Sequence, residues 1–338
     1  MRTAALTLLA ALDGQQRALA AQPFEDHAAR RWLEYRPRHR PGASIAQMSE
    51  APRKAAHRLL STGLSDHAYA QAMSIIALEE VLDRREHWRR GRHSNDYWVS
   101  VVGDPAGDAA VDATGDPAGD ATGDATGDTT GDAPWSWRFE GHHLSVTMTV
   151  AAGQVSPAPV FFGANPACVS YAGRPVSRPL APEEDLAQVL LDAMSPAERA
   201  LAVIAGQAPS DIRTGTSPRA REDIQPLGVA AGQLGSGPRA VLGELVTAYL
   251  DRLPAELAAR EADRLAGAEL HFAWEGPLVP GARHYYRVQG DDLLIEYDTT
   301  DDGNHAHTVL RRPRSDFGDD VLAEHYRQVR HNAAGTAQ

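Results

Sequence analysis

Cysteine is almost absent from this chain of 338 residues, which contains Cys168 and no other. A single thiol cannot form a disulfide within the chain, and it cannot hold a zinc ribbon or an iron–sulfur cluster. Long apolar runs are also missing, because no run approaches the roughly 18–20 residues that span a bilayer. The sequence therefore excludes a disulfide-stapled scaffold and predicts neither a membrane-spanning helix nor a membrane partner.

Positive charge is scarce, since 33 Lys and Arg residues face 45 Asp and Glu residues and give a formal net charge of −12. No basic stripe is concentrated anywhere, so binding to the phosphate backbone of a nucleic acid is not expected. The phosphate-binding loop G-x-x-x-x-G-K, the nucleophile elbow G-x-S-x-G and the zinc helix H-E-x-x-H are absent as well. These absences predict no nucleotide cofactor, and they leave a small molecule as the expected ligand.

Aspartate is concentrated in a low-complexity segment at residues 103–133, where it recurs at every fourth position. The eight residues are Asp104, Asp108, Asp112, Asp116, Asp120, Asp124, Asp128 and Asp132. Without them the net charge would be −12 + 8 = −4, which is ordinary for a globular protein. A calcium-binding β-helix repeat has a nonapeptide period with a stacking apolar residue, and this short unit has neither. We therefore expect a flexible surface insertion in the connection between two strands.

Residues 4–12 form an apolar stretch behind Arg2, and two interpretations of it are open. A signal peptide over residues 1–20 would direct the protein out of the cell. Polar side chains such as Asp13 precede the expected cleavage site, which favours instead an amphipathic helix over residues 4–21 and a cytoplasmic protein. The leucines expected to pack on the domain are Leu6, Leu9, Leu12 and Leu19.

Hydrophobic residues make up 43% of the chain, which is enough for a core. Apolar periodicity predicts helices at residues 49–63, 65–88, 182–193, 196–204, 239–249, 254–265 and 319–330. Alternating segments predict strands at residues 96–103, 135–150, 270–275, 284–289, 293–298 and 305–311. Residues 206–238 are rich in Gly, Pro and Ser and are expected to be irregular. The last helix is expected to turn Val321, Leu322 and either His325 or Tyr326 inward.

Two β-rich blocks, separated and preceded by helices, indicate the α+β class. We expect one large domain over residues 1–333, in which a helical N-terminal part and a helical middle pack on an antiparallel sheet. Residues 334–338 are expected to form a disordered tail. No segment between the two β blocks resembles an inter-domain linker, so two separate domains are not predicted.

Histidine is frequent, with 14 residues, and several of them lie on predicted strands. His305 and His307 are separated by one residue, so both imidazoles point to the same face of a strand. His142 and His143 lie on another predicted strand, and His284 begins a third. Two histidines on one strand and a third from its neighbour can supply the nitrogen ligands of a zinc, iron, copper or manganese ion.

The vicinal pair allows two arrangements. Strand alternation places His142 on the apolar face with Leu144, and His143 on the polar face with Ser145. A site inside the core would use His142, whereas a catalytic site open to water would use His143. We favour His143 for this reason.

Several segments of the chain are distinctive in combination. They are FEGHHLSV (139–146), VFFGANPA (160–167), HYYRVQGDDLLIEYD (284–298), NHAHTVLR (304–311) and DFGDDVLAEHY (316–326). Together they resemble a bacterial and fungal domain-of-unknown-function family, numbered 3500, over residues 4–330. The chain departs from the family pattern in the aspartate insertion and in residues 206–238, and neither departure touches the histidine motifs. The resemblance implies that residues 4–12 belong to the domain, and it implies no activity.

Three functions fit these residues. In a metal-dependent enzyme the histidines bind the ion, and Glu296 or Glu140 is a further ligand or the general base. Arg287 and Tyr286 would then orient the substrate. In a metal-free enzyme the histidines act as acid and base, and in a non-enzymatic protein they recognise a ligand or partner. The metal-dependent enzyme is the function that we expect, with hydrolysis and oxidation both open.

Overall fold

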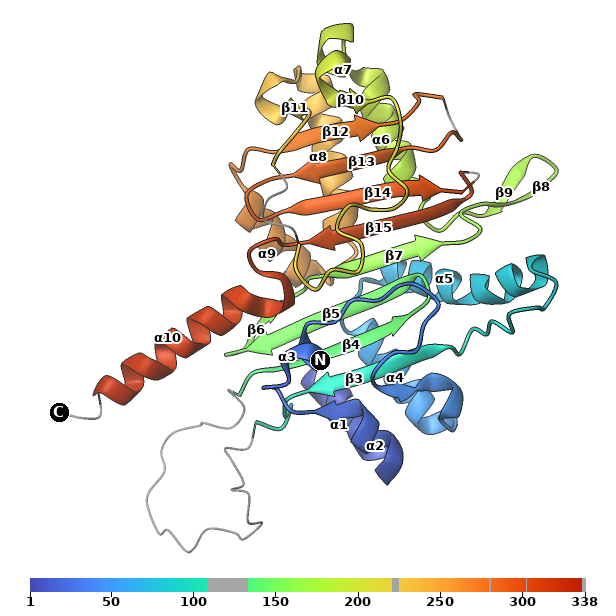
Figure 1. The fold of residues 1–338 in the computed structure, drawn as a ribbon. Helices are drawn as coiled ribbons and strands as arrows, with labels where there is room; N and C mark the ends of the chain where they lie inside the picture. The colour runs from blue at the N-terminus through green and yellow to red at the C-terminus, as the bar shows by residue number, and fades with distance from the viewer. Residues whose placement is uncertain (108–132, 221–224, 280, 302, 336–338) are drawn as a thin grey trace, which may run out of the picture.

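A computed structural model describes residues 1–107, 133–220, 225–279, 281–301 and 303–335 (Figure 1). Most of the aspartate-rich insertion expected at residues 103–133 lies outside the described residues, and so do residues 336–338 of the expected tail. Residues 334 and 335 belong to the last helix. Within the described part of the chain, no helix combines the length and the apolar character that a membrane span requires.

Each helix and strand predicted from the sequence has a counterpart in the structure, whereas the strand at residues 160–164 and several short elements were not predicted. The helices are α1 (Arg2–Ala11), α2 (Gly14–Ala20), α3 (His27–Arg30), α4 (Glu50–Ser61), α5 (Asp66–Arg85), α6 (Ala181–Ala193), α7 (Pro196–Ala202), α8 (Ser236–Leu250), α9 (Ala255–Leu265) and α10 (Asp319–Gly335), with short turns η1 (Ile45–Gln47), η2 (Ala231–Gln233) and η3 (Asp316–Gly318). The strands are β1 (Ala21–Gln22), β2 (Ala43–Ser44), β3 (Tyr97–Val102), β4 (Trp135–Gly141), β5 (Leu144–Ala151), β6 (Gln154–Ser156), β7 (Val160–Ala164), β8 (Val169–Tyr171), β9 (Arg174–Ser177), β10 (Val203–Ala205), β11 (Val229–Ala230), β12 (His271–Glu275), β13 (Tyr285–Gln289), β14 (Leu294–Thr300) and β15 (His305–Arg311). The predicted α+β class is confirmed.

One sheet joins the N-terminal and C-terminal halves of the molecule. Its main path is β1-β3-β4-β5-β7-β15-β14-β13-β12-β10, with β2, β6 and β11 paired alongside. In the described chain its strand pairs are antiparallel except β1–β3 and β10–β12. Strand β7 pairs with β5 on one side and with β15 on the other, so it connects the two halves. This continuity makes the molecule a single α+β domain.

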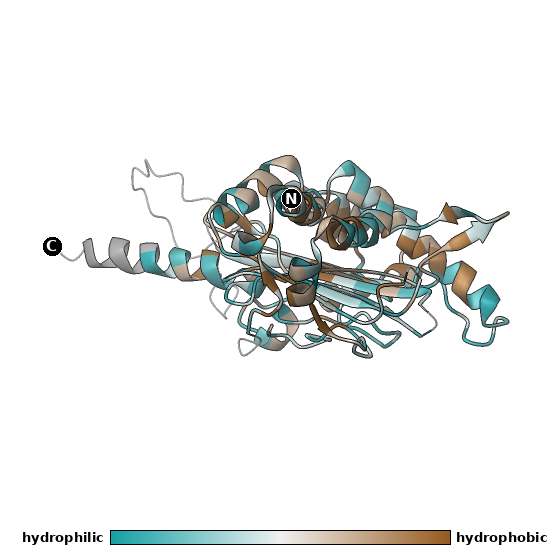
Figure 2. Cartoon of the chain, turned by 90° about the horizontal axis from the view of Figure 1, so that it is seen from above, coloured by the Kyte–Doolittle hydropathy of each residue, from teal (hydrophilic) through white to brown (hydrophobic). Residues whose placement is uncertain are grey.

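Different segments of the chain pack on the two faces of the sheet. Helices α1, α4, α5, α6 and α8 lie behind the sheet in Figure 1, and Figure 2 shows the helices gathered on one side of it. Leu8, Leu59, Ile75, Leu190 and Leu245 from these helices share one buried core with the sheet. The opposite face is crossed by irregular segments, and a small second cluster there joins Leu33, Tyr35 and Ile212 to Phe161, Val309 and Phe317. We call these the helix face and the loop face.

The single helix expected over residues 4–21 is wrong, because α1 ends before Asp13 and α2 begins after it. The Asp13 carboxylate accepts the backbone N–H of Gln16, and the Gln16 side chain accepts the backbone N–H of Asp13. This reciprocal cap starts a new helix. Of the expected packing leucines, Leu12 is buried and Leu9 packs partly against the core, whereas Leu6 and Leu19 are exposed.

The uninterrupted strand expected over residues 135–150 is also wrong. The chain reverses at His142 and His143 to form the hairpin of β4 and β5, in which Gly141 pairs with Leu144. His143 has a φ of 62°, in the left-handed region that tight reversals use and that histidine adopts more readily than most residues. Apolar residues occupy odd positions up to Phe139 and even positions from Leu144, so the alternation changes phase at the turn, and this signal contradicts a single strand.

Smaller differences concern the helical middle and the last helix. The helix expected over residues 196–204 ends at Ala202, and the chain continues as the edge strand β10. The segment expected to be irregular, residues 206–238, contains β11 and η2 and the first turn of α8. In α10, Leu322 is buried as expected, Val321 and His325 are half-buried, and Tyr326, the alternative to His325, is exposed.

Candidate metal centre

Strand β15 presents His305 and His307 on the loop face of the sheet, as their spacing predicts. Their neighbours Ala306 and Leu310 point to the helix face and lie in the main core. His307 is buried and His305 is half-buried. The centroids of the two rings are 4.6 Å apart. The strand therefore holds two imidazoles side by side.

The hairpin turn brings His143 to the same place from the other half of the sheet. The His143 backbone N–H donates to the carbonyl of Tyr35 at 3.0 Å, and its carbonyl accepts the N–H of Gly163 at 2.7 Å. These two bonds fix the turn between the loop segment and β7. The His143 ring centroid lies 4.9 Å from that of His305 and 5.4 Å from that of His307.

Gly163 leaves the space in which the three rings meet. It pairs with His307 across β7 and β15. A Cβ atom at this position would lie 2.8 Å from Cδ2 of His143 and 3.2 Å from Cδ2 of His307. Because the first distance is shorter than real Cβ contacts allow, any larger residue here would push the rings apart. The missing side chain is thus part of the site.

The imidazole nitrogens of His143, His305 and His307 converge. The Nε2 atoms of His143 and His305 are 2.8 Å apart. One nitrogen from each of the three rings can be chosen so that all lie within 4.8 Å of one another. Ligands at about 2.1 Å from a shared ion are separated by roughly 3–4 Å, so the three nitrogens lie near this spacing and need shifts of about an ångström or less to share an ion.

Carboxylates lie at the outer nitrogens of the rings. Nδ1 of His305 is 2.8 Å from Oδ2 of Asp301, and Nδ1 of His307 is 2.9 Å from Oδ1 of Asp211. Nδ1 of His143 lies 3.8 Å from Oε1 of Glu79. For His305 and His307, the carboxylate hydrogen-bonded at Nδ1 favours the tautomer that carries its proton there and leaves Nε2 free as a ligand. The contact of His143 with Glu79 is beyond hydrogen-bond distance and does not fix its tautomer.

Burial keeps His143 and His305 neutral. Burial, together with the neighbouring rings of His142, His307 and His305, holds the pKa of His143 well below its usual value. Burial, assisted by His307, lowers the pKa of His305 to about 4, although Asp301 opposes the shift. Since a metal ion binds the neutral imidazole, both rings are in the ligand form at neutral pH.

Two further groups adjoin the three histidines. Oε1 of Glu79 on α5 lies 2.6 Å from Nδ1 of His142, whose ring centroid lies 3.7 Å from that of His143 with the two planes tilted by 33°. On the other side, Asp298 Oδ1 is 3.6 Å from Nδ1 of His307, and neither Asp298 oxygen has a hydrogen-bond partner among the described residues. Burial, with Asp211 nearby, raises the pKa of Asp298 well above its usual value. Each group also has the geometry to hold an ion.

In the metal-free protein, His305 should make the fold sensitive to acid. Its folded-state pKa is about 4, and its unfolded pKa is near the ordinary value of 6.5. The unfolded state therefore binds more protons in this window, and the contribution of His305 to stability is lost as the pH falls from 6.5 to about 4. Acidification from pH 7 to pH 5 should remove about 2 kcal/mol through this residue.

Urea unfolding of chelator-treated wild type and His305→Asn at both pH values measures this effect. The loss of unfolding free energy should be about 2 kcal/mol smaller in the variant than in the wild type. Equal losses in the two proteins would contradict the assignment of a buried, neutral His305.

Glu296, expected as a ligand or general base, lies on the loop face of β14 but anchors a loop. Its carboxylate accepts the backbone N–H groups of Arg213 and Thr214, the Thr214 hydroxyl and the Tyr285 hydroxyl. All of its near partners are donors from the protein itself. Its hydrogen bonds hold the segment that presents Asp211 to His307.

Glu140 and Arg287 also have structural partners. Glu140 is buried, accepts the backbone N–H of Glu34 and the Ser145 hydroxyl, and lies 3.8 Å from Nε of Arg40. Arg287 donates to the carbonyl of Gln225. Neither belongs to the described groups that could hold an ion. The structure thus places both outside the histidine cluster.

His284 and Tyr286 were expected in the same cleft, and the structure corrects this. Tyr285 pairs with Asp298, which in turn pairs with His307, so Tyr285 shares the loop face and its neighbours share the helix face. The His284 ring stacks 4.6 Å from Trp274. The Tyr286 hydroxyl donates to the backbone carbonyl of Glu183, deep in the core. His284 and Tyr286 are each one residue away from Tyr285 along the strand. Their side chains therefore point to the opposite face of the sheet and lie outside the site.

Sequence reasoning missed the acidic partners Glu79, Asp211, Asp298 and Asp301. Asp298 and Asp301 lie close to His305 in sequence, so the run of acidic residues before the H-x-H pair was an available signal. Glu79 lies within an ordinary amphipathic helix, and Asp211 lies in a segment without periodicity. Nothing local marks those two.

The fold and the cluster together define an α+β protein with a candidate metal centre where the two halves of its sheet meet. The chain belongs to the family described as "Protein of unknown function (DUF3500)", whose model matches residues 1–111 and 125–319. The resemblance drawn from the sequence is thereby confirmed, and the gap in the match falls inside the aspartate-rich segment. No curated protein and no solved structure matches the chain.

Proposed function

We propose that this protein is a metal-dependent enzyme whose ion is held by Nε2 of His143, His305 and His307. The observation that supports it most directly is the convergence of these rings from two halves of the sheet, with a carboxylate hydrogen-bonded to the outer nitrogens of His305 and His307. Asp301 and Asp211 fix the rings of His305 and His307, and Nε2 of His143 lies 2.8 Å from Nε2 of His305.

The donor set favours activation of water as the chemistry. Three neutral imidazoles leave the positive charge of a zinc ion uncompensated, and such a site lowers the pKa of a coordinated water toward about 7. Three protein ligands also leave a coordination position for water or substrate. We therefore favour hydrolysis over oxidation, and zinc over copper, iron or manganese.

The carboxylates have separate tasks in this proposal. Asp211 holds the ring of His307 and is itself bound by the Tyr35 hydroxyl at 2.9 Å, so its position is fixed from two sides. Asp301 holds His305, and its side chain is 72% exposed. The centre is thus open to solvent beside Asp301 and His305, which is where a small-molecule substrate would enter.

Metal analysis of untagged protein tests the proposal. The purified chain is treated with a chelator, dialysed and titrated with Zn²⁺, Cu²⁺, Mn²⁺ and anaerobic Fe²⁺ in the presence of a competing chromophoric chelator. We expect one tightly bound ion per chain, with Zn²⁺ retained after gel filtration. Protein that takes up no ion under any of these conditions would overturn the proposal.

A further inference from the structure

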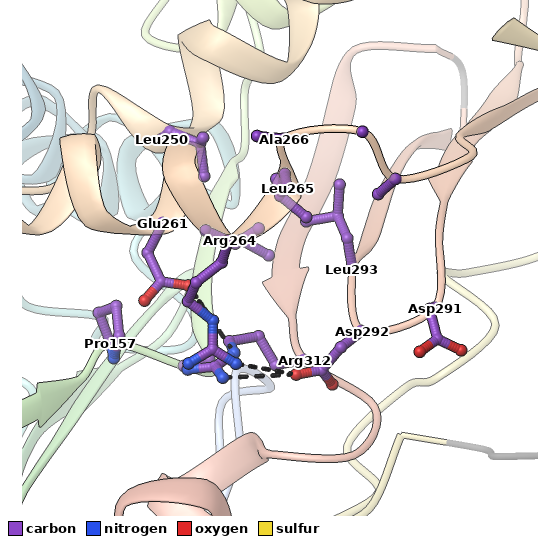
Figure 3. Close-up of a pocket in the computed structure, with 14 residues that line it drawn as sticks. Pro157, Leu250, Glu261, Arg264, Leu265, Ala266, Asp291, Asp292, Leu293 and Arg312 are labelled. Carbon is purple, nitrogen blue, oxygen red and sulfur yellow. Dashed lines mark hydrogen bonds and ion pairs between the residues drawn. The ribbon is translucent and has the colours of Figure 1, made fainter.

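Two cavities of the molecule differ in whether their charged side chains are already paired. In the first, Arg264 and Arg312 each lie 3.4 Å from the carboxylate of Asp292 (Figure 3). The second has a volume of about 570 Å³ and lies beside the turn between β4 and β5. Its lining comes from residues 37–40 and 90–98, together with Glu79 of α5 and His142 of the turn. We call this second cavity the hairpin pocket.

Positive charge predominates in the lining of the hairpin pocket, although the chain as a whole carries a net charge of −12. The charged lining residues are Arg38, Arg40, Arg90 and Arg92 on one side of the balance and Glu79 and Asp96 on the other. With histidine counted as neutral, the formal charge of the lining is +2. A positive concavity in an acidic protein favours an anionic ligand over a cationic one.

Arg38 and Arg90 are the lining arginines that remain available to a ligand. Arg38 is exposed, and its guanidinium has no partner among the described residues. Arg90 has a side chain that is 64% exposed, and its Nε lies 3.6 Å from Glu86, beyond hydrogen-bond distance. In contrast, Arg40 donates to three backbone carbonyls, and Arg92 donates to Glu86 at 2.7 Å. An anion can therefore bind two guanidinium groups without breaking a hydrogen bond of the fold.

The inner wall of the pocket offers a hydrogen-bond acceptor. His142 is 8% exposed, and the Glu79 carboxylate at 2.6 Å from its Nδ1 favours the tautomer with the proton on that nitrogen. Nε2 of His142 is then an acceptor, and it has no hydrogen bond among the described residues. It is not one of the buried unpartnered atoms, so it reaches the accessible surface of the pocket wall. A hydroxyl or N–H group of a ligand would satisfy it.

Trp98 and Pro37 supply the apolar part of the lining. Trp98 is half-buried, and its ring is held by the edge of His39, with centroids 6.2 Å apart, and by the Arg40 guanidinium 5.5 Å above it. A fixed indole ring is a favourable contact for a flat aromatic group. The pocket volume lies within the range of small-molecule sites and is large enough for two fused rings.

We propose that the hairpin pocket binds an aromatic carboxylate that carries a hydroxyl group at the opposite end of its ring system. The carboxylate accepts hydrogen bonds from Arg38 and Arg90, the rings pack against Trp98, and the hydroxyl donates to Nε2 of His142. The pocket adjoins the metal centre through His142, but its lining includes none of the three proposed metal ligands. The proposal therefore does not rest on the metal-dependent function.

Calorimetric titration of the full chain with 6-hydroxy-2-naphthoate tests the proposal. We expect saturable binding at one site per chain and at least tenfold weaker binding by Arg38→Gln. The neutral 6-hydroxy-2-naphthamide should bind at least tenfold more weakly, and 2-naphthoate, which lacks the hydroxyl, at least fivefold more weakly. The matched control is Arg85→Gln, an exposed arginine at the end of α5 outside the pocket lining, which should bind as the wild type does.

A second variant and a metal control complete the test. His39 is an exposed lining residue, so His39→Glu should place a negative charge in the pocket and weaken binding at least tenfold with every arginine intact. Because carboxylates also bind zinc, the titration is run on Zn²⁺-loaded and on chelator-treated protein, and equal affinities are expected.

Absence of binding by the wild type would overturn the proposal. So would an affinity that is unchanged in both Arg38→Gln and His39→Glu, or binding that requires Zn²⁺. Failure of the chain to take up Zn²⁺ would leave naphthoate binding as expected here, so this proposal and the metal-dependent function fail by different measurements.

Discussion

Replacing His143 by asparagine is expected to weaken Zn²⁺ binding by more than a hundredfold. The three rings converge through one residue of the β4–β5 hairpin and two residues of β15, so this variant removes the only ligand that the hairpin supplies to the cluster of three histidines. Loss of an outer partner of a metal-bound histidine already costs about 10–100-fold in affinity, and loss of a ligand costs more. Asparagine is chosen because it tolerates the left-handed conformation of the turn, where φ is 62°.

His67→Asn is the matched control. His67 is exposed near the start of α5, whereas Glu79 lies twelve residues further along that helix, about 18 Å at 1.5 Å per residue. Competition titration with a chromophoric chelator measures the affinity, and circular dichroism checks that both variants fold. Affinity in His143→Asn equal to that of the control would show that the hairpin histidine is not a ligand.

The sequence predicted the part of this centre that depends on local spacing. An H-x-H pair on a strand places both rings on one face whatever the rest of the fold does, and β15 has the residue bounds that were expected. The helices were also located by local signals, such as the Ser65 cap at the start of α5. Apolar periodicity and helix caps depend on residues that are close together in the sequence. A single amino-acid sequence is therefore enough to recognise them.

The rest depends on register and on contacts between distant segments. His284 and Tyr286 were placed in the site because their strand neighbours β14, yet the pairing of Tyr285 with Asp298 turns both to the other face. A register shift of one residue reverses every side chain, and no local pattern fixes it. His143 was favoured as the open face of a strand, and it lies instead in a turn, which the change of phase in the alternating pattern between Phe139 and Leu144 marks.

Replacing Glu296 by alanine is expected to lower the free energy of unfolding by about 4 kcal/mol, at the upper end of single-substitution effects. The carboxylate is fully buried and accepts the N–H groups of Arg213 and Thr214 as well as the hydroxyls of Thr214 and Tyr285. Its removal leaves these donors unpaired in a water-poor site. The loop that presents Asp211 should then loosen, and Zn²⁺ affinity should fall about 10–100-fold through loss of the His307 partner.

These expectations separate an anchoring role for Glu296 from a role as general base. A base that contacts only substrate could be removed without a loss of stability or of metal affinity, since neither property involves it. Urea unfolding and Zn²⁺ competition on Glu296→Ala measure both quantities, with Glu256→Ala as the exposed control. If the variant unfolds at the wild-type urea concentration and binds Zn²⁺ equally well, the anchoring role is wrong and the carboxylate becomes available for chemistry. If both fall together, the loop and the histidine cluster form one cooperative unit, joined through Asp211.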